Sequence, residues 1–322
     1  MSVKTDFSIK DLENLSGVKA HTIRIWEKRY DLLEPQRTDT NIRSYDGYNL
    51  QRLLNVAMLV ERGHKISKLS KLEDEQLFAT VREEVLNKGN HRFYLNEFKM
   101  SMLNFDQELF DSTYNKLLAD FSFREIFKKI FVDLLEEIGV LWMTDTITPV
   151  HEHFISTLIQ QKILINIERV QGNVSQKDKA FVLFLPLNEI HELGLLYMHF
   201  ELLLKGYRSV YLGASVPVDN LVELRNMFSN IVYVSYFTIY PEKEKVEDYV
   251  NHIGEEILEK SNEQLWVLGR NTRDLDSQLL HKSVKIFEKI EKIKSISKQL
   301  NSDIRSALNT ITNCRIFNQF RG

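Results

Sequence analysis

The chain has 322 residues, of which 43% are hydrophobic, and this composition is typical of a globular protein with about two domains. It has no apolar run of roughly 18 residues and no signal pattern at its start, so we expect a cytoplasmic protein without a membrane span. Its net charge of -3 is uneven: residues 1–72 carry 13 Lys and Arg against nine Asp and Glu, or +4, which leaves -7 for the remainder. A basic segment joined to an acidic remainder is typical of a protein that contacts phosphates at one end only.

Two short helical patterns around a glycine occupy the start of the chain. Ser8, with Asp11 three residues later, is a capping pattern that predicts a helix, and Gly17 predicts its end. The second pattern, Lys19–Tyr30, has one apolar and one cationic face by helical periodicity. A helix of this kind behind a tight turn suits insertion into a DNA major groove. The apolar face carries Ile23, Trp26 and Tyr30, and the opposite face carries His21, Arg24 and Lys28.

Residues 7 to about 72 resemble the MerR family of winged-helix transcription regulators. The string Arg24-Ile25-Trp26-Glu27-Lys28-Arg29-Tyr30 is similar to the branch of light- and cobalamin-responsive repressors typified by CarH and LitR. The resemblance places a wing at Pro35–Tyr45, a helix at Leu50–Arg62 and a short helix that runs through Leu72. Lys19 stands where such proteins often have Ser or Thr as the helix cap. We expect His21, Thr22, Arg24 and Lys28 in or beside the major groove, and Arg37, Thr38, Arg43 and Tyr45 in a wing on the phosphates.

Residues 74–170 have helical periodicity throughout and no proline until Pro149. Their apolar stripes predict a bundle of four antiparallel helices. One predicted stripe consists of Phe98, Met102, Phe105 and Leu109, and a second consists of Ile126, Ile130, Leu134 and Ile138.

The pattern changes at Lys179 to short apolar runs separated by helical stretches. This alternation predicts a doubly wound parallel sheet with crossover helices, after a polar linker at residues 171–177. Residues 282–299 are expected to form an amphipathic helix. The predicted strands are Ala180–Leu185, Val210–Leu212, Ile231–Val234 and Leu265–Leu268. The expected domains are a winged helix at 1–75, a four-helix bundle at 76–172, an α/β domain at 178–300 and a tail of unknown structure at 301–322.

The motif Glu189-x-His191-x-x-Gly194 follows the first predicted strand, where open α/β sheets bind ligands. Imidazole is a suitable ligand for a transition metal such as cobalt, and a nearby carboxylate can orient it. A polar surface loop is the alternative. With Ser235 and Gly269 at fitting distances, the segment resembles the cobalamin-binding signature, which implies that His191 is a lower axial ligand of cobalt. Phe237 and Arg270 depart from that signature, and Arg270 stands where a second glycine is usual.

A second motif, Trp142 followed after nine residues by Glu152-His153, stands at the end of the predicted bundle. Ordinary packing between helices is one explanation. The spacing also resembles the signature of CarH-like proteins, in which these residues cap the upper face of the corrin ring. Light-sensing members have a second ligating His directly after the Trp, and this chain has Met143, a weaker ligand for cobalt(III). The resemblance therefore predicts no light response, or one that reverts readily.

Three functions remain open at this stage. The first is a transcription repressor, not an enzyme, that binds double-stranded promoter DNA as a dimer or tetramer and senses adenosylcobalamin or methylcobalamin. The second is the same regulator with domains that only oligomerise, without cobalamin. The third is a corrinoid-carrying enzyme module, which the basic winged helix disfavours because a methyl carrier does not need to bind DNA.

Overall fold

The computed structural model describes residues 6–37, 41–88, 91–258, 263–273, 275–276 and 280–287. The chain divides into two compact units, residues 1–158 and 159–322, and each is described by itself. Thr38 and the tail at 301–322 lie outside the described residues. Within the described part of the chain, no helix has the length and apolar character needed to cross a bilayer.

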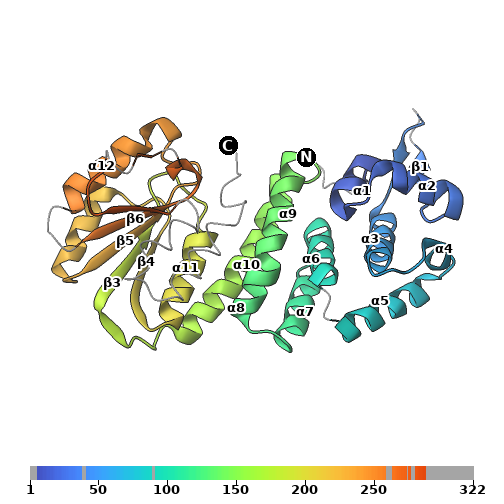
Figure 1. Cartoon of the computed structure of the whole chain (residues 1–322), viewed down its shortest axis with the longest axis horizontal. Helices are drawn as coiled ribbons and strands as arrows, with labels where there is room; N and C mark the ends of the chain where they lie inside the picture. The colour runs from blue at the N-terminus through green and yellow to red at the C-terminus, as the bar shows by residue number, and fades with distance from the viewer. Residues whose placement is uncertain are drawn as a thin grey trace. The chain divides into compact units, whose positions relative to one another are not determined.

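The first unit opens with the two predicted helices, α1 (Ile9–Ser16) and α2 (Ala20–Tyr30) (Figure 1). The Ser8 side chain accepts from the N–H of Asp11, whose carboxylate accepts in return from the N–H of Ser8, so the capping pattern is confirmed. Gly17 ends α1 with φ 77°, in the left-handed region that glycine tolerates best. Lys19 provides no side-chain cap for α2, and the Glu13 carboxylate of α1 accepts from the N–H of Ala20 instead.

The wing consists of two antiparallel strands, β1 (Gln36–Arg37) and β2 (Arg43–Ser44). Helix α3 follows and begins three residues earlier than predicted, because the Asp46 side chain caps it by accepting from the N–H of Asn49. The two helices that come next are α4 and α5. Their bounds are Gly47–Glu61 for α3, Ile66–Leu69 for α4 and Asp74–Lys88 for α5.

Four helical segments make the bundle, as predicted (Figure 1). The third of them is continuous through a π-helical turn, η1, that joins α8 to α9. The stripe that begins at Ile126 is buried along its whole length, whereas the stripe through Phe105 is wrong. Phe105 lies between two helices with φ 54°, so the periodicity does not continue across it. The segments are α6 (His91–Asn104), α7 (Gln107–Leu118), α8 (Phe123–Ile126) with η1 (Phe127–Phe131) and α9 (Val132–Met143), and α10 (Pro149–Val170).

The second unit contains a parallel five-stranded sheet in the order β4-β3-β5-β6-β7. This is the flavodoxin-like order of a doubly wound sheet, and its switch point lies between β3 and β5. Two expectations were wrong at its limits: the first strand begins inside the predicted linker, and the predicted helix at 282–299 begins with a strand. The strands are β3 (Gln176–Phe184), β4 (Tyr207–Gly213), β5 (Ile231–Tyr236), β6 (Gln264–Leu268) and β7 (Val284–Phe287).

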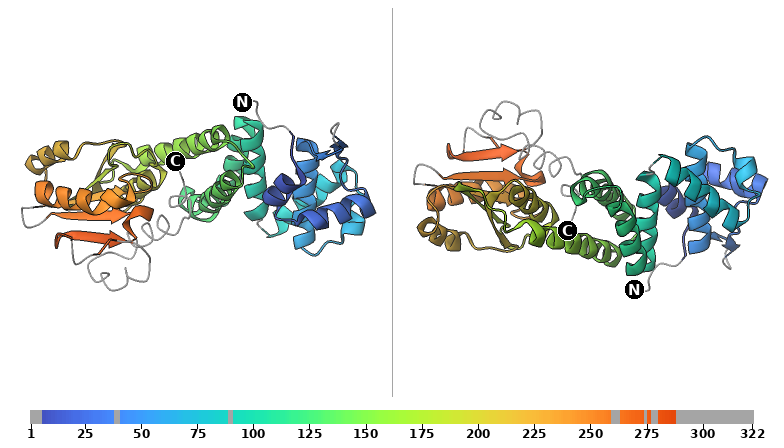
Figure 2. Two further views of the ribbon diagram at one scale, coloured as in Figure 1. Left: turned by 90° about the horizontal axis from the view of Figure 1, so that it is seen from above. Right: turned by 90° about the horizontal axis from the view of Figure 1, so that it is seen from below.

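Helical segments cover both faces of the sheet. α12 (Val246–Ile257) and the 3-10 helix η2 (Val218–Asn226) pack on the face that carries Val182 and Tyr233, and Figure 2 shows α12 alongside the strands. α11 (Leu193–Leu204) contacts β3, β4 and β5. Because side chains alternate along each strand, Phe181 and Trp266 belong to the other face, where their rings meet at 5.6 Å.

Candidate functional sites in the two units

The exposed face of α2 carries the side chains predicted to meet DNA. His21, Arg24 and Lys28 are exposed, and Thr22 is half-buried. Ile25 lies on the same face with 51% of its surface exposed, although an apolar side chain there gains nothing from water. The sequence analysis did not identify Ile25 as a candidate. Its position between Arg24 and Lys28 on the cationic face of the helix could have indicated a role in DNA binding.

The wing is fastened to α2 by one carboxylate. Glu27 accepts from Arg43 Nε at 2.8 Å and from the Tyr45 hydroxyl at 2.8 Å. Burial and this carboxylate raise the pKa of Tyr45. Its side chain is 0% exposed, so the prediction that Tyr45 contacts a phosphate was wrong, because the ring fills the core beneath the wing. Arg37 remains exposed on β1.

The tryptophan motif lies at the end of the bundle within the first unit. Trp142 is half-buried in the last turn of α9, and Met143 beside it is exposed. In the first turn of α10, Glu152 accepts from the Ser156 hydroxyl at 2.6 Å and pairs with His153 Nδ1 at 3.0 Å. His153 is otherwise exposed, so the pair presents an oriented imidazole at the surface of this unit.

The histidine motif of the second unit is organised by Glu189, whose side chain is 0% exposed. One carboxylate oxygen accepts from the N–H groups of Ile190 and His191, both at 3.0 Å, and from His191 Nδ1 at 2.5 Å. The other oxygen accepts from three consecutive N–H groups at 2.7 to 3.0 Å. Those three groups belong to Thr238, Ile239 and Tyr240.

This environment determines the charge of Glu189 and the tautomer of His191. Burial alone would raise the pKa of Glu189, but hydrogen bonds from the His191 ring and the surrounding N–H groups outweigh it and lower the pKa to about 2. The carboxylate is therefore ionised at neutral pH. Because it accepts from His191 Nδ1, the lone pair of the neutral imidazole is on Nε2, the arrangement found in ligands of metal ions.

The two loops that Glu189 joins follow the carboxyl ends of β3 and β5, on either side of the switch point. Ser235 is buried at the end of β5 and donates to the carbonyl of Phe184 at 3.0 Å. Gly269 has φ 106°, and a Cβ atom there would lie 2.3 Å from the carbonyl oxygen of Phe237. Only glycine fits at that position. Gly194 is buried in the first turn of α11.

Two protein families match this chain, and both matches lie between residues 7 and 165. Residues 7–76 match the MerR HTH family of regulatory proteins, and residues 94–165 match the B12 binding domain family. The chain is therefore a DNA-binding regulator that contains a MerR-type HTH domain and a B12 binding domain. It is 28% identical over 222 residues to the HTH-type transcriptional repressor CarH of Myxococcus xanthus, covering 67% of this chain and 73% of that protein.

A second relative and one solved structure are also similar to this chain. The HTH-type transcriptional repressor CarA of the same organism is 25% identical over 218 residues, covering 66% of this chain and 70% of its own. The monomethylamine corrinoid protein of Methanosarcina barkeri has a similar fold, with a TM-score of 0.50 at 14% identity, and the match covers 61% of this chain and 92% of that one. The predicted fold class, with a helical head, a bundle and a parallel α/β sheet, is confirmed.

A buried charge network within the first unit joins the bundle of this regulator to its DNA-binding head. Lys99 of α6 is 1% exposed, and its Nζ donates to the carbonyl of Leu15 at 2.9 Å and to Glu137 at 2.8 Å. Arg92 donates to the same carboxylate at 3.0 Å and to the carbonyl of Ser16 at 3.3 Å. Burial lowers the pKa of Lys99, which makes the Glu137 carboxylate necessary for its charge.

The cations of this network contact the last turn of α1, where carbonyl groups have no partner within the helix. A second contact lies nearby: Asn14 donates to the Thr146 hydroxyl at 2.9 Å, in the loop that follows α9. The head and the bundle therefore meet through polar contacts directly before Gly17 and the DNA-facing helix. Sequence reasoning missed them, and a lysine among the apolar residues of α6 was the only signal.

Proposed function

We propose that this regulator is a repressor that binds a corrinoid through His191 and changes its hold on promoter DNA in response. The observation that carries the proposal is the Glu189–His191 pair, in which one buried carboxylate fixes the tautomer of the imidazole at the switch point of the sheet. Stability alone does not explain this pairing. A buried carboxylate could hold the loop in place without fixing the orientation of an imidazole ring.

The residues around this pair fit a flat macrocycle with a central metal ion. Leu187, two residues before Glu189, and Ile190, between Glu189 and His191, are both exposed, and apolar side chains at such a place suit the face of a large ring. A bound corrinoid would supply a cobalt ion and, in adenosylcobalamin or methylcobalamin, an upper alkyl group. His191 Nε2 would hold the cobalt, and Glu189 would keep the imidazole oriented.

By its resemblance to the signature of CarH-like proteins, the tryptophan motif is our candidate for the contacts to the upper group of the ligand. Trp142, Glu152 and His153 would contact the upper group, and Glu152 would orient His153. Met143 beside Trp142 is a thioether and a weak ligand for cobalt(III), so loss of the upper group by light leaves no strong replacement ligand. A corrinoid then shifts the protein between two states only by the difference in its affinity for them.

Phe237 and Arg270 support a second candidate, a regulator whose bundle and sheet serve only for oligomerisation. Phe237 is buried in the core between the sheet and α12, and Arg270 begins a 3-10 turn where the related signature has glycine. The enzyme module is the weakest candidate, because the chain has a MerR-type head.

An absorption spectrum separates these candidates. Full-length protein is incubated with adenosylcobalamin or methylcobalamin, gel-filtered in the dark, and measured before and after light. We expect co-elution of the corrinoid with wild type and an altered spectrum or weaker binding with His191→Ala. The matched control is His252→Ala, which removes an exposed histidine of the same unit. Equal binding and identical spectra for wild type and His191→Ala would contradict the ligand role. If the wild-type protein binds no corrinoid but still represses transcription, the second candidate is correct and the bundle and sheet serve only for oligomerisation.

For DNA, we propose that α2 enters the major groove with Arg24 and Lys28, together with His21 and Thr22, and that Arg37 and Arg43 contact phosphates. Ile25 would contact the methyl group of a thymine, the one apolar feature of the groove. A single α2 covers one half-site, so the active form is at least a dimer on a near-palindrome. Analytical ultracentrifugation that finds a monomer at micromolar concentration, both free and on DNA, would contradict this assembly.

A further inference from the structure

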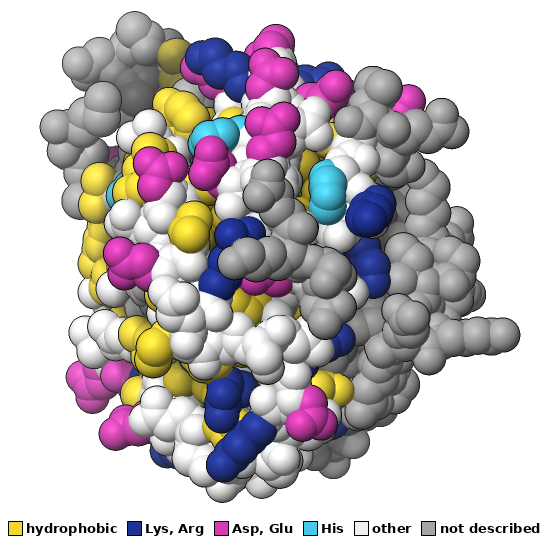
Figure 3. All heavy atoms as spheres, turned by 90° about the vertical axis from the view of Figure 1, so that its left-hand side faces the viewer, with side chains coloured by type: hydrophobic (Ala, Val, Ile, Leu, Met, Phe, Trp, Pro, Cys, Tyr) yellow, Lys and Arg dark blue, Asp and Glu magenta, His cyan; other side chains and the backbone are white. Residues whose placement is uncertain are grey.

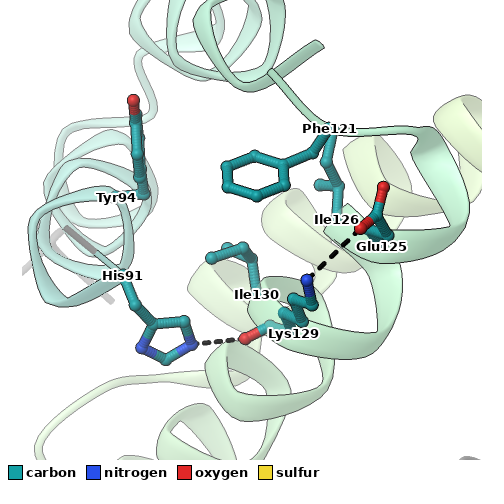
Figure 4. Close-up of a pocket in the computed structure, with 7 residues that line it drawn as sticks. All are labelled: His91, Tyr94, Phe121, Glu125, Ile126, Lys129 and Ile130. Atoms are coloured by element: carbon teal, nitrogen blue, oxygen red, sulfur yellow. Dashed lines mark hydrogen bonds and ion pairs between the residues drawn. The ribbon is translucent and has the colours of Figure 1, made fainter. Parts of the chain in front are cut away.

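The bundle contains a cavity of about 210 Å³ that none of the roles above uses (Figure 4). Its walls are the rings of Tyr94 and Phe121, and the buried side chains of Ile126 and Ile130 form its floor. All of these residues lie in the first unit, between the start of α6 and the helix that begins at Phe123. We propose that this cavity binds a neutral, planar aromatic molecule and that its occupancy changes DNA binding through α6.

The cavity is distinct from the surface assigned to the corrinoid. Ile126 and Trp142 belong to one continuous helix and are 16 residues apart along it. At a rise of ~1.5 Å per residue they are separated by about 24 Å. A molecule in the cavity therefore cannot contact the groups at Trp142, and the two sites can be occupied independently.

The charges at the rim explain why the ligand should be neutral. Lys129 Nζ pairs with Glu125 at 3.3 Å and lies 5.3 Å from the centre of the Phe121 ring. His91 Nε2 lies 2.9 Å from Asp133. The Lys129 ammonium already has an anion and the His91 ring already has a carboxylate partner, so a charged ligand would have to separate one of these pairs. The paired rim still offers hydrogen bonds to a single polar group on the ligand.

The size and the walls indicate the aromatic class. An apolar cavity of about 150 Å³ in another protein holds benzene, so this larger one has room for one substituted ring or two fused rings. The Tyr94 and Phe121 side chains favour a ring, because aromatic pairs gain about 0.5–1.5 kcal/mol beyond area burial in offset or edge-on contact. Indole has the right size, is neutral, and carries one N–H donor, so it is the probe.

The π-helical turn η1 lines the cavity and provides Ile130 at its floor and Lys129 at its rim. Such turns are rare and occur often at functional sites. His91, the first residue of α6, contacts the carbonyl of Lys129 in this turn (Figure 4). The hydrogen bond joins α6 to the π turn directly beside the cavity, so a ligand that separates these two helices also moves the start of α6.

The start of α6 is connected to the DNA-binding head. Arg92 follows His91 directly and donates to Ser16 of α1 and to Glu137, and Lys99 of the same helix donates to Leu15. Displacement of α6 therefore acts on the last turn of α1, which precedes the DNA-facing helix. This part of the proposal rests on DNA binding by α2.

Indole binding to the full-length protein is measured by titration calorimetry, with benzoate and cyclohexanol as charged and non-aromatic comparisons. We expect one indole per chain, at least tenfold weaker binding of both comparisons, and at least tenfold weaker indole binding by Phe121→Ala. Phe78→Ala, which removes a partly exposed ring of α5, is the matched control and should bind indole like wild type. Absence of binding at millimolar indole, equal loss in both variants, or equal affinity for benzoate overturns the site.

The coupling is measured with a DNA duplex selected by the full-length protein from a random pool. Saturating indole should change the Kd for this duplex at least threefold. Lys99→Met, or Arg92→Gln if the first variant does not fold, should abolish that change while indole still binds. An unchanged Kd for wild type overturns the coupling. Failure of the protein to select any duplex would instead contradict the proposed DNA binding, and the calorimetry would still decide the site.

Discussion

The DNA-binding head and the α/β unit are each organised around one glutamate, and the two glutamates work in opposite surroundings. Glu27 is partly exposed and accepts two side-chain donors, which fasten the wing to α2. Glu189 is fully buried and accepts six hydrogen bonds, five of them from backbone N–H groups. Water competes for the first set of contacts and is excluded from the second.

The difference follows from what each region has to bind. A surface for DNA must remain hydrated and carry free cations, so Glu27 fixes the wing without neutralising Arg24 or Lys28. A metal-ligating imidazole needs one fixed orientation, and a buried carboxylate with few alternatives provides it. One face of the second unit, shown in Figure 3, has Lys, Arg, Asp and Glu side chains interspersed among its described residues, in contrast to the cationic face of α2.

The largest expected effect is that of Glu189→Gln. The amide of Gln has N–H donors of its own, and one of them would face backbone N–H groups that donate to the carboxylate in the wild-type protein. Because the pKa of Glu189 falls from 4.5 to about 2 on folding, the carboxylate contributes on the order of 3 kcal/mol of stability at neutral pH. In hydrogen exchange at pH 7 the amides of Ile239 and Tyr240 should lose protection in the variant.

The sign of the pH dependence provides a second test of Glu189. Its contribution is complete above pH 4.5 and declines as the pH falls toward 2, because the unfolded chain binds the proton first. Protection in wild type should decrease across this window, whereas Glu189→Gln should show a flatter profile. Glu244→Gln, at an exposed position before α12, is the control. If wild type, Glu189→Gln and Glu244→Gln show equal protection, Glu189 does not stabilise its loops, and its burial does not distinguish it from Glu27.

Arg24→Ala should weaken binding of the selected duplex by about 1–3 kcal/mol if Arg24 contacts a base edge. Its guanidinium is exposed on the DNA-facing side of α2. Fluorescence anisotropy at several salt concentrations measures the loss. Arg82→Ala, which removes an exposed arginine of α5, should leave the affinity unchanged. Wild-type DNA affinity of the Arg24→Ala protein would contradict the assignment of α2 as the helix in the major groove.

Ile25 should contribute less to DNA affinity than Arg24, and its contribution should depend on the methyl group of a thymine. Replacement of one contacted thymine by uracil should weaken wild-type binding by about 1 kcal/mol, since burial of one methyl-sized group contributes roughly 0.8 kcal/mol. Ile25→Ala should bind the two duplexes equally. Anisotropy with a uracil scan of the duplex finds the position. If no position shows the difference, Ile25 does not contact a thymine.

Glu27→Gln should have the smallest effect, because Arg43 is partly exposed and water can replace the lost ion pair. We expect DNA affinity to fall by no more than about 1 kcal/mol. The fold should persist because the Tyr45 ring stays buried. Thermal unfolding and anisotropy check both statements. If Glu27→Gln loses as much stability as Glu189→Gln, burial does not explain a difference between the contributions of the two carboxylates.

The sequence determined the features that depend on neighbouring residues. Ser8, Asp11 and Gly17 predicted the limits of α1 correctly, because capping and left-handed backbone need only a few adjacent residues. Apolar runs predicted four of the five strands for the same reason. The spacing of Glu189 and His191 predicted their pairing, since a carboxylate two residues from an imidazole can reach its Nδ1.

Only the tertiary structure decided which side chains are available for function. Tyr45 was predicted at a phosphate and is buried, because the wing folds its ring onto the helices before it. Val284–Phe287 was predicted as helix and is a strand, because β6 supplies a partner for its backbone. Lys99 reaches a carbonyl 84 residues earlier in the chain. No local pattern specifies such a contact, since its free energy comes from a partner that only the folded chain brings within reach.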